Sequence, residues 1–397
     1  MSGFGPEHLP YGVFRRASEE SRAEEAARDR DEPRVGVRFD DGVLDLAALA
    51  RDGLLEEDPV LFAQPSLNRF MAAGPEVWRR VREALGALTA GPDAELAAVP
   101  LEEAELLLPV AVGDYVDFYS SIEHASNVGR MFRPDADPLP PNWRHLPAGY
   151  HGRSGTVVVS GTPIRRPRGQ RRDAGDPAPV YGPSTRLDIE LELGFVVGVP
   201  SRHGEPVPVD RALEHVFGVV LLNDWSARDL QAWEYRPLGP FLAKSFATSI
   251  SAWVTPLDAI VGRRVPAPAQ EPEPLPYLRE DPWALDLDLE VALNGATIAR
   301  TNARHLYWSA AQQLAHMTVN GASLRVGDLY GSGTISGPER EQRGSLLELS
   351  WNGTEPIALP GGSTRTFLED GDEVVLRGRA GEAIALGEVR GRIEPAG

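Results

Sequence analysis

The chain contains no cysteine among its 397 residues. Disulfides, a thiolate nucleophile and a sulfur-bound metal are therefore excluded, and any metal must be held by oxygen or imidazole. Long apolar runs are also absent, since the longest near the middle, Val216 to Leu222, is far too short to cross a bilayer. The N-terminus lacks the basic-then-apolar pattern of an export signal, so a cytoplasmic location is expected.

Basic residues are fewer than acidic residues. The chain carries 58 acidic and 40 basic residues, which gives a formal net charge of −18. A nucleic-acid surface needs clustered positive charge, so nucleic-acid binding is not expected. With 42% hydrophobic and 25% charged residues, the composition is that of an ordinary globular protein. The length allows two domains, or one large domain with a small appendage.

Three carboxylates alternate with apolar residues between Leu187 and Gly194. This alternation predicts a β-strand with Asp188, Glu190 and Glu192 on one face. A solvated strand face is the simpler interpretation of such a pattern. However, the uniformly apolar segment Phe195 to Val199 follows directly, which indicates that the strand runs into a core. Like charges beside a core favour a divalent-cation site, because such ions prefer oxygen ligands.

Two other acidic segments could complete such a site. Asp224 follows the apolar run Phe217 to Leu222, so we expect it at the end of a buried strand. An N-cap role for Asp224, ahead of a helix over Ser226 to Tyr235, is an equal alternative. Asp117 lies in a segment rich in aromatic and hydroxyl groups. A possible oxygen cage for calcium or magnesium then comprises Asp117, Glu190, Glu192 and Asp224.

Two basic side chains near these acids could take part in chemistry. His124 lies seven residues after Asp117, which makes it a candidate general base, although a lone histidine is more often structural. Lys244 lies in an apolar segment of a chain with very few lysines for its many arginines. It could stabilise an oxyanion or pair with the acids, and a snorkelling surface lysine is the alternative.

Strand-like segments outnumber helix-like ones, which predicts a mainly β protein. A hairpin is expected over Arg34 to Leu46, around Asp40-Asp41-Gly42. Helices are expected at Pro75 to Thr89 and at Ser309 to Val319, and a helical or connecting piece at Leu101 to Leu108. The charge-rich run from Arg15 to Arg34 has alternating signs and is assigned no function.

Several longer motifs resemble the fumarylacetoacetase family, in order and from about Leu9 to the C-terminus. They are Asp114-Tyr115-Val116-Asp117-Phe118-Tyr119-Ser120-Ser121, His124-Ala125-Ser126-Asn127-Val128-Gly129, Asn142-Trp143, Gly149-Tyr150-His151-Gly152-Arg153, Asn223-Asp224-Trp225-Ser226-Ala227-Arg228-Asp229, Trp233-Glu234-Tyr235, Leu238-Gly239-Pro240-Phe241, Gly333-Thr334-Ile335-Ser336-Gly337 and Leu347-Glu348-Leu349-Ser350-Trp351.

The resemblance implies a small SH3-like N-terminal barrel over residues 1–108 and a catalytic domain of mixed β-sandwich and roll over 109–397. It also implies a homodimer that hydrolyses the carbon–carbon bond of 4-fumarylacetoacetate to fumarate and acetoacetate, the last step of tyrosine and phenylalanine breakdown. The substrate is a small β-diketo acid.

The resemblance also implies roles for individual residues. The active-site Ca²⁺ would be bound by Asp117, Glu190, Glu192 and Asp224, and a second, structural Mg²⁺ would lie among Asp224, Lys244 and Thr248. His124 would be the base, oriented by Glu348. Arg228, Gln231 and Lys244 would lie near the oxyanionic or leaving groups. Substrate contacts would come from Tyr119, Arg133, Tyr150, Gln231, Tyr235 and Thr334.

Some positions depart from the family pattern. Ile122 and Tyr330-Gly331 stand where the family more often has other residue types, and the run Arg15 to Arg34 looks like an insertion into the first hairpin. The resemblance gives no ligand role to Asp188, which is an extra acid on the same strand face. An acylpyruvate hydrolase or keto-acid decarboxylase of the same fold is the nearest alternative, but a decarboxylase needs no water-activating base. A calcium-binding β-rich recognition module is the alternative from another class, and its acids should lie in exposed loops.

Overall fold

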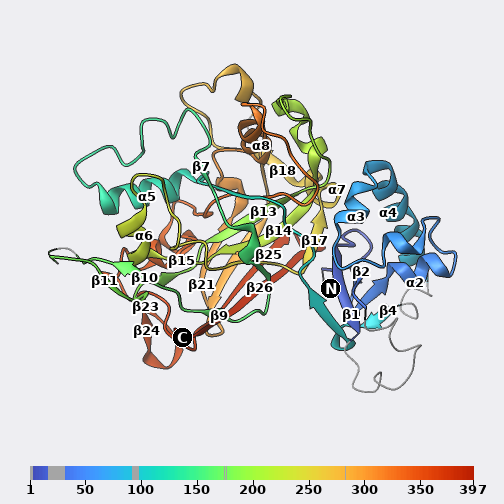
Figure 1. The fold of residues 1–397 in the computed structure, drawn as a ribbon, viewed down its shortest axis with the longest axis horizontal. Helices are drawn as coiled ribbons and strands as arrows, with labels where there is room; N and C mark the ends of the chain where they lie inside the picture. Colours follow the sequence, from blue (N-terminus) through green and yellow to red (C-terminus); the bar gives the residue numbers. More distant parts are fainter. Residues whose placement is uncertain (1–2, 17–31, 92–97, 174, 176, 282) are drawn as a thin grey trace.

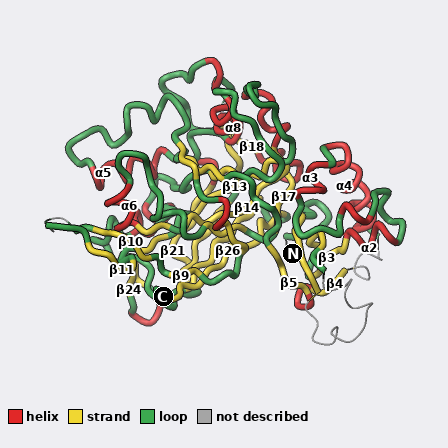
Figure 2. The backbone as a smooth tube through the Cα atoms, in the orientation of Figure 1, coloured by secondary structure: helices red, strands yellow, loops and turns green. Residues whose placement is uncertain are grey.

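The computed structural model describes residues 3–397 except 17–31, 92–97, 174, 176 and 282. Most of the charge-rich run from Arg15 to Arg34 therefore lies outside the described residues. The described chain is mainly β, as predicted, with two principal sheets and shorter strand pairs (Figures 1 and 2). No helix among the described residues is both long and apolar enough to span a membrane.

The larger sheet has thirteen strands, and its central path runs β4-β3-β2-β1-β17-β14-β13-β22-β6-β7. β5 pairs with β1, β16 pairs with β14, and β8 pairs with β16. The bounds of these strands are β1 (Tyr11–Arg16), β2 (Arg34–Phe39), β3 (Gly42–Asp45), β4 (Ala98–Pro100), β5 (Ala104–Leu107), β6 (Tyr115–Phe118), β7 (Gly149–His151), β8 (Val157–Val159), β13 (Leu191–Val197), β14 (Val216–Asp224), β16 (Thr248–Ile250), β17 (Trp253–Pro256) and β22 (Leu329–Gly331).

Within the described ranges, the second sheet has five strands, and four further strand pairs lie outside both sheets. In spatial order, the second sheet contains β21 (Ala296–Asn302), β20 (Asp288–Leu293), β25 (Glu373–Ala380), β26 (Ile384–Glu394) and β9 (Ile164–Arg165). The pairs are β10 (Arg168–Arg171) with β11 (Val180–Pro183), β12 (Leu187–Asp188) with β15 (Ser226–Ala227), β18 (Arg264–Pro266) with β19 (Trp283–Leu285), and β23 (Ile357–Ala358) with β24 (Thr364–Arg365).

Most of the helices are short, and they lie around the sheets (Figure 2). They are α2 (Leu46–Arg51), α3 (Asn68–Ala72), α4 (Pro75–Thr89), α5 (Ile122–Phe132), α6 (Arg228–Glu234), α7 (Leu257–Ile260), α8 (Ala310–Thr318) and α9 (Leu346–Leu349). The predicted helices over Pro75–Thr89 and Ser309–Val319 are thus confirmed as α4 and α8. Ser309 begins α8 as part of a capping box with Gln312, which satisfies backbone N–H groups at the helix start.

β14 separates two apolar cores because it is buried on both faces. Its residues Val219 and Leu221 pack into the core shared with the second sheet. Val220 and Leu222 point the other way, into the core formed with the N-terminal strands and α3 and α4. Asp224 ends this strand, so its carboxylate is presented from a rigid element. The strand-end prediction is confirmed, and the N-cap alternative is wrong, because Ala227 precedes α6.

The N-terminal strands extend the large sheet at one end of the molecule (Figure 1). The predicted hairpin is confirmed, since Phe39 pairs with Gly42 and Asp40 takes the positive φ of 43° that this tight turn requires. Of the helical or connecting piece expected at Leu101 to Leu108, Leu101–Glu103 is a single 3₁₀ turn, but Ala104–Leu107 is instead the strand β5, which pairs with β1. Among the described residues no pairing closes these strands into a barrel, and the SH3-like detail stays a prediction.

The alternation predicts one continuous strand over the acidic segment Leu187–Gly194. The structure instead divides this segment into two strands, β12 and β13. β12 pairs with β15, whereas β13 pairs with β14, so the chain changes partners between Asp188 and Leu191. At this break the backbone N–H of Glu190 donates to the side-chain oxygen of Asn223 at 3.0 Å. The change of partner separates Asp188 from the other two acids.

Candidate active site

Four carboxylates from neighbouring segments of the large sheet meet in the interior. Asp117 lies on β6, Glu190 at the break before β13, Glu192 on β13 and Asp224 at the end of β14. Their ligand atoms all lie within 4.8 Å of one another, and each residue is at most 5% exposed. The predicted oxygen cage is therefore brought together by β14, β13 and β6, with β22 lying between β13 and β6 in the sheet, and by the break before β13 that carries Glu190. We call these four residues the acidic cluster.

Three oxygens of the acidic cluster have no hydrogen-bond partner among the described residues: Asp117 Oδ1, Glu192 Oε1 and Asp224 Oδ1. Burial, together with the neighbouring carboxylates, raises the pKa of Asp117 and that of Glu192 well above their usual range. Burial also raises the pKa of Asp224, although Lys244 opposes the rise. Unpaired buried carboxylate oxygens are costly, so the cluster is suited to a bound cation.

Two buried cations neutralise only part of this charge. Lys244, the one lysine of the chain, donates from Nζ to Glu190 and, at 2.6 Å, to Asp224 Oδ2. Arg228 donates from its terminal nitrogen to Glu190 Oε1 at 2.7 Å. Burial alone would raise the pKa of Glu190, but the charges of Arg228 and Lys244 lower it. Glu190 is thus the one member of the cluster whose two oxygens both have a cationic partner, and each of the other three keeps one oxygen without a hydrogen-bond partner among the described residues.

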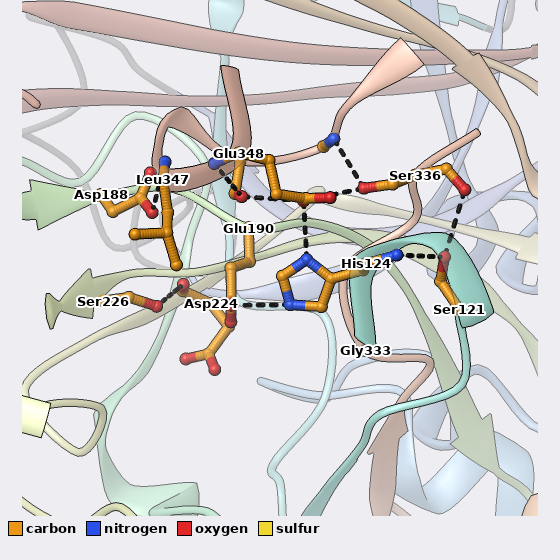
Figure 3. A network of polar contacts seen from close by, with 12 residues as sticks. Ser121, His124, Asp188, Glu190, Asp224, Ser226, Gly333, Ser336, Leu347 and Glu348 are labelled. Carbon is orange, nitrogen blue, oxygen red and sulfur yellow. Dashed lines mark hydrogen bonds and ion pairs between the residues drawn. The ribbon is translucent and has the colours of Figure 1, made fainter. Parts of the chain in front are cut away.

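A histidine–carboxylate pair faces the acidic cluster (Figure 3). His124 lies in the first turn of α5, where its backbone N–H donates to the N-cap Ser121. Its Nδ1 lies 2.6 Å from Glu348 Oε2 on α9, and its Nε2 lies 3.8 Å from Glu190 Oε1. Burial would raise the pKa of Glu348, but His124 and the hydrogen bonds to the carboxylate lower it. An ionised Glu348 fixes the ring with Nδ1–H as donor and Nε2 free toward the cluster.

Residues outside the predicted set hold Glu348 in place. Asn127 donates to Glu348 Oε1 at 2.9 Å, and the hydroxyls of Ser336 and Ser345 both donate to Oε2 at 2.9 Å. Asn127 lies one turn after His124 on the same helix face, so its spacing in the sequence was a usable signal. Ser345 is the N-cap of α9, and the spacing Ser345-x-x-Glu348 is a capping signature that the sequence also offered, whereas Ser336 carried no local signal.

A cavity of about 320 Å³ opens between the acidic cluster and His124. Of the expected substrate contacts, Tyr119, Tyr150, Gln231 and Thr334 line it. Arg133 and Tyr235 do not. Arg133 is exposed at the end of α5 and donates to the carbonyl of Pro138, and Tyr235 is 42% exposed. Leu238, Gly239 and Pro240 form part of the wall, so the loop after α6 borders the cavity.

A second cavity of about 310 Å³ lies on the other side of Asp224 and Lys244, and Thr248 also lines it. Tyr150 borders both cavities and donates to Asp224 Oδ2 at 2.7 Å. The ammonium of Lys244 is a donor to two carboxylates, so it is not available as a metal ligand. Any metal contact from this residue would have to come from its carbonyl oxygen.

Comparison with known proteins gives matches along the whole chain. Residues 7–112 match the model of the fumarylacetoacetase N-terminal family, and residues 115–394 match that of the fumarylacetoacetate (FAA) hydrolase C-terminal family. The chain is 48% identical to the fumarylacetoacetases of Rattus norvegicus and Homo sapiens over 417 residues, which cover 100% of this chain and 97% of each relative. The Oryza sativa fumarylacetoacetase is 44% identical and covers 100% of the chain and 95% of its own length.

Solved structures share the fold at low sequence identity. A fumarylacetoacetate hydrolase from Exiguobacterium antarcticum matches with a TM-score of 0.58 and 17% identity, covering 98% of this chain and 99% of its own. A maleylpyruvate hydrolase from Sphingobium sp. SYK-6, solved with manganese(II) and pyruvate, matches with a TM-score of 0.55 and 16% identity, covering 98% and 100%.

Proposed function

The chain belongs to the fumarylacetoacetate hydrolase family, and from that premise we propose that it hydrolyses the carbon–carbon bond of 4-fumarylacetoacetate, giving fumarate and acetoacetate. It is a hydrolase, and this reaction places it at the last step of tyrosine and phenylalanine breakdown. The observation that carries the proposal is the His124–Glu348 pair, which faces a buried acidic cluster across one cavity.

His124 is the general base in this proposal. Glu348 accepts a hydrogen bond from Nδ1–H, so the lone pair of Nε2 is left to take a proton from a water molecule in the cavity. The attack of this water on the diketone carbonyl makes a tetrahedral oxyanion, and the carbon–carbon bond then breaks. The leaving carbanion is tolerable only because the neighbouring carbonyl delocalises its charge as an enolate. A decarboxylase of this fold would not need such a base, so the pair favours hydrolysis.

The acidic cluster fits a divalent cation on its own geometry. The free oxygens of Asp117, Glu192 and Asp224 lie among four carboxylates whose ligand atoms are within 4.8 Å of one another. We propose Ca²⁺ as the ion, bound by these three residues and Glu190. When bound, the ion supplies Lewis-acid polarisation of the two diketone oxygens. A Mg²⁺ near Asp224, the carbonyl of Lys244 and Thr248 is proposed as a second, structural ion.

The oxyanion is stabilised by three donors. Lys244 and Arg228 hold positive charge beside the cavity, and Gln231 accepts from Arg228 through its Oε1 at 3.1 Å. That contact leaves the amide N–H₂ of Gln231 free to donate to substrate. Substrate contacts come from Tyr119, Tyr150 and Thr334 on the cavity wall. Arg133 and Tyr235 remain proposed contacts, and from their exposed positions they would act at the mouth of the site.

Three further proposals rest on the family resemblance. Residues 1–108 and 109–397 form an SH3-like N-terminal domain and a catalytic domain, respectively. Two copies of the chain form a homodimer, which sedimentation or light scattering tests directly. The protein works in the cytoplasm, which cell fractionation tests.

The decisive experiment follows the absorbance of 4-fumarylacetoacetate after purified protein is added. The wild-type protein is expected to remove the absorbance, to lose this activity when a chelator is added, and to regain it with Ca²⁺. If the protein binds Ca²⁺ but leaves this substrate unchanged while it cleaves an acylpyruvate, the substrate assignment is wrong and the cation site stands. If no diketone is cleaved under any metal, the hydrolytic assignment itself is wrong.

A further inference from the structure

Asp188 is a fully buried carboxylate for which the proposed reaction has no use. Its Oδ1 accepts hydrogen bonds from the backbone N–H groups of Ile189 at 2.8 Å and Leu346 at 2.7 Å. Its Oδ2 accepts from Arg228 Nε at 2.8 Å and from the N–H of Leu347 at 3.1 Å. All four neighbours are donors, so both carboxylate oxygens are fully engaged, and Figure 3 shows Asp188 beside Leu347.

Asp188 is not part of the acidic cluster. The four residues that could share a metal do not include it, and both its oxygens already have partners. The break between β12 and β13 turns it away from Glu190 and Glu192 and toward α9. The alternation in the sequence suggests three equivalent acids, whereas the fold gives this one a different set of neighbours.

The two groups that Asp188 holds serve different parts of the site. Arg228 lies on the cation side, where its other nitrogens donate to Glu190 and Gln231. Leu346 and Leu347 are the first residues of α9, which carries Glu348 and through it orients His124. With four residues, α9 is too short to fix its own orientation by internal hydrogen bonds.

We propose that Asp188 is a positioning residue, which holds Arg228 and the Glu348-bearing turn at a fixed separation so that the oxyanion donor and the water-activating base act at the same substrate carbonyl. The inference rests on the proposed function, because it takes Arg228 and Glu348 to serve in that reaction. A carboxylate is needed because a neutral amide would turn its own N–H₂ group toward one pair of donors. A small misplacement of reacting groups is enough to slow catalysis strongly.

The test compares Asp188→Asn with a matched control, Asp45→Asn. Asp45 is also a buried aspartate that pairs with an arginine, Arg34 at 3.3 Å, and accepts a helix-start N–H, Ala48 at 3.0 Å. It lies on β3, in the N-terminal region. We expect Asp188→Asn to lower kcat about 30-fold with little change in KM, whereas Asp45→Asn leaves kcat unchanged.

A double-mutant cycle separates positioning from general loss of structure. In a Glu348→Gln background, Asp188→Asn is expected to lower kcat by less than about threefold, because the base is already misplaced. If the double variant instead loses kcat by the product of the two single-variant losses, the proposal is wrong. Ca²⁺ affinity, measured by calorimetry without substrate, should be unchanged in Asp188→Asn, and a large loss would instead make Asp188 a part of the metal site.

A readout without substrate keeps this inference separate from the assigned reaction. Hydrogen exchange at Leu346 and Leu347 should speed up in Asp188→Asn and not in Asp45→Asn, whatever the substrate of the protein is. Unchanged exchange at these two amides would overturn the proposal even if the enzyme is active on 4-fumarylacetoacetate. If Asp188→Asn does not fold, Asp188→Ser, which keeps one small acceptor, is measured in the same way, and wild-type kcat in a folded Asp188→Ser would also overturn it.

Discussion

The N-terminal region and the active site both bury carboxylates, but they treat them differently. In the N-terminal region Asp45 is matched by Arg34 and a helix-start N–H. Among the described residues of 3–112, the Tyr11 hydroxyl is the one buried side-chain polar atom without a partner. In the active site three carboxylate oxygens of the acidic cluster lack partners. The first arrangement stabilises a fold, and the second holds charge ready for a ligand.

The two arrangements differ because of where their residues come from. Asp45 and its partners lie within fourteen positions of one another, on β2, β3 and α2. The acidic cluster gathers residues as far apart as Asp117 and Asp224, and the cores on both sides of β14 hold the strands rigid enough to keep them together. The packing of these two cores therefore offsets the repulsion between the carboxylates of the acidic cluster. Substitutions in the active site should therefore lower activity more than stability. Substitutions in the N-terminal region should lower stability more than activity.

The largest effect is expected for His124→Ala. Without the base, kcat should fall by about 10²–10⁴-fold, because water is no longer deprotonated as it attacks. Ca²⁺ affinity should be retained, since the ring is not a member of the acidic cluster. Steady-state kinetics and calorimetry on the same preparation check both statements. Full turnover in this variant would assign the base to another group.

The opposite result, a large loss of stability with little change in activity, is expected for Phe70→Ala in the N-terminal core. Phe70 is fully buried, and its ring packs against those of Tyr11, Phe62 and Phe217. Its truncation should cost about 3–5 kcal/mol of unfolding free energy through lost burial and a new cavity. Denaturant unfolding measures this loss, and kcat of the folded fraction should stay near the wild-type value. A specific loss of kcat would mean that the N-terminal core also controls the geometry of the site.

A smaller effect, confined to acid pH, is expected at His8. Its Nδ1 contacts the carbonyl of Gly3 and its Nε2 the hydroxyl of Thr255, and burial lowers the pKa of His8 to about 4. Between 6.5 and 4 the unfolded chain binds a proton that the folded protein does not. Stability is therefore complete above pH 6.5 and is lost as the pH falls toward 4, by up to about 3 kcal/mol.

Unfolding curves of wild type and His8→Gln between pH 4 and 7 test this link. The substitution should flatten the pH dependence because glutamine does not titrate in this range. If the two proteins lose stability in parallel, other groups control the acid response, and the contact between the N-terminal segment and β17 is not pH-sensitive.

The difference between contacts that are local in the sequence and contacts between distant segments explains what the sequence could and could not predict. The β2–β3 hairpin, α4 and the strand end at Asp224 follow from local patterns, which the fold keeps. The acidic cluster was expected from the alternating acids, the strand end at Asp224 and the segment around Asp117, whereas the pairing of His124 with Glu348 was expected only through the family resemblance. The role of Asp188 was out of reach because it depends on a change of strand partner and on the placement of α9, 158 positions away.

The smallest effect, and the one that tests the comparison most directly, is expected for Asp117→Asn. In a chelator the wild-type protein must keep Asp117 beside Asp224 and Glu192 with no cation between them, which is unfavourable. Burial and these neighbours raise the pKa of Asp117, so proton uptake already relieves part of the repulsion. Removing the charge should then stabilise the metal-free protein by about 1 kcal/mol.

With excess Ca²⁺ the order should reverse, because the wild-type protein gains binding free energy that the variant has largely lost. Thermal or urea unfolding of both proteins, with chelator and with Ca²⁺, gives the four values required. Asp45→Asn is the control, and it should destabilise the protein equally under both conditions because its partners are protein groups. If Asp117→Asn also destabilises the metal-free protein, the acidic cluster stores no repulsion, and the unpaired oxygens must be satisfied by water. The two regions would then differ in where their polar partners come from, and not in whether they have them.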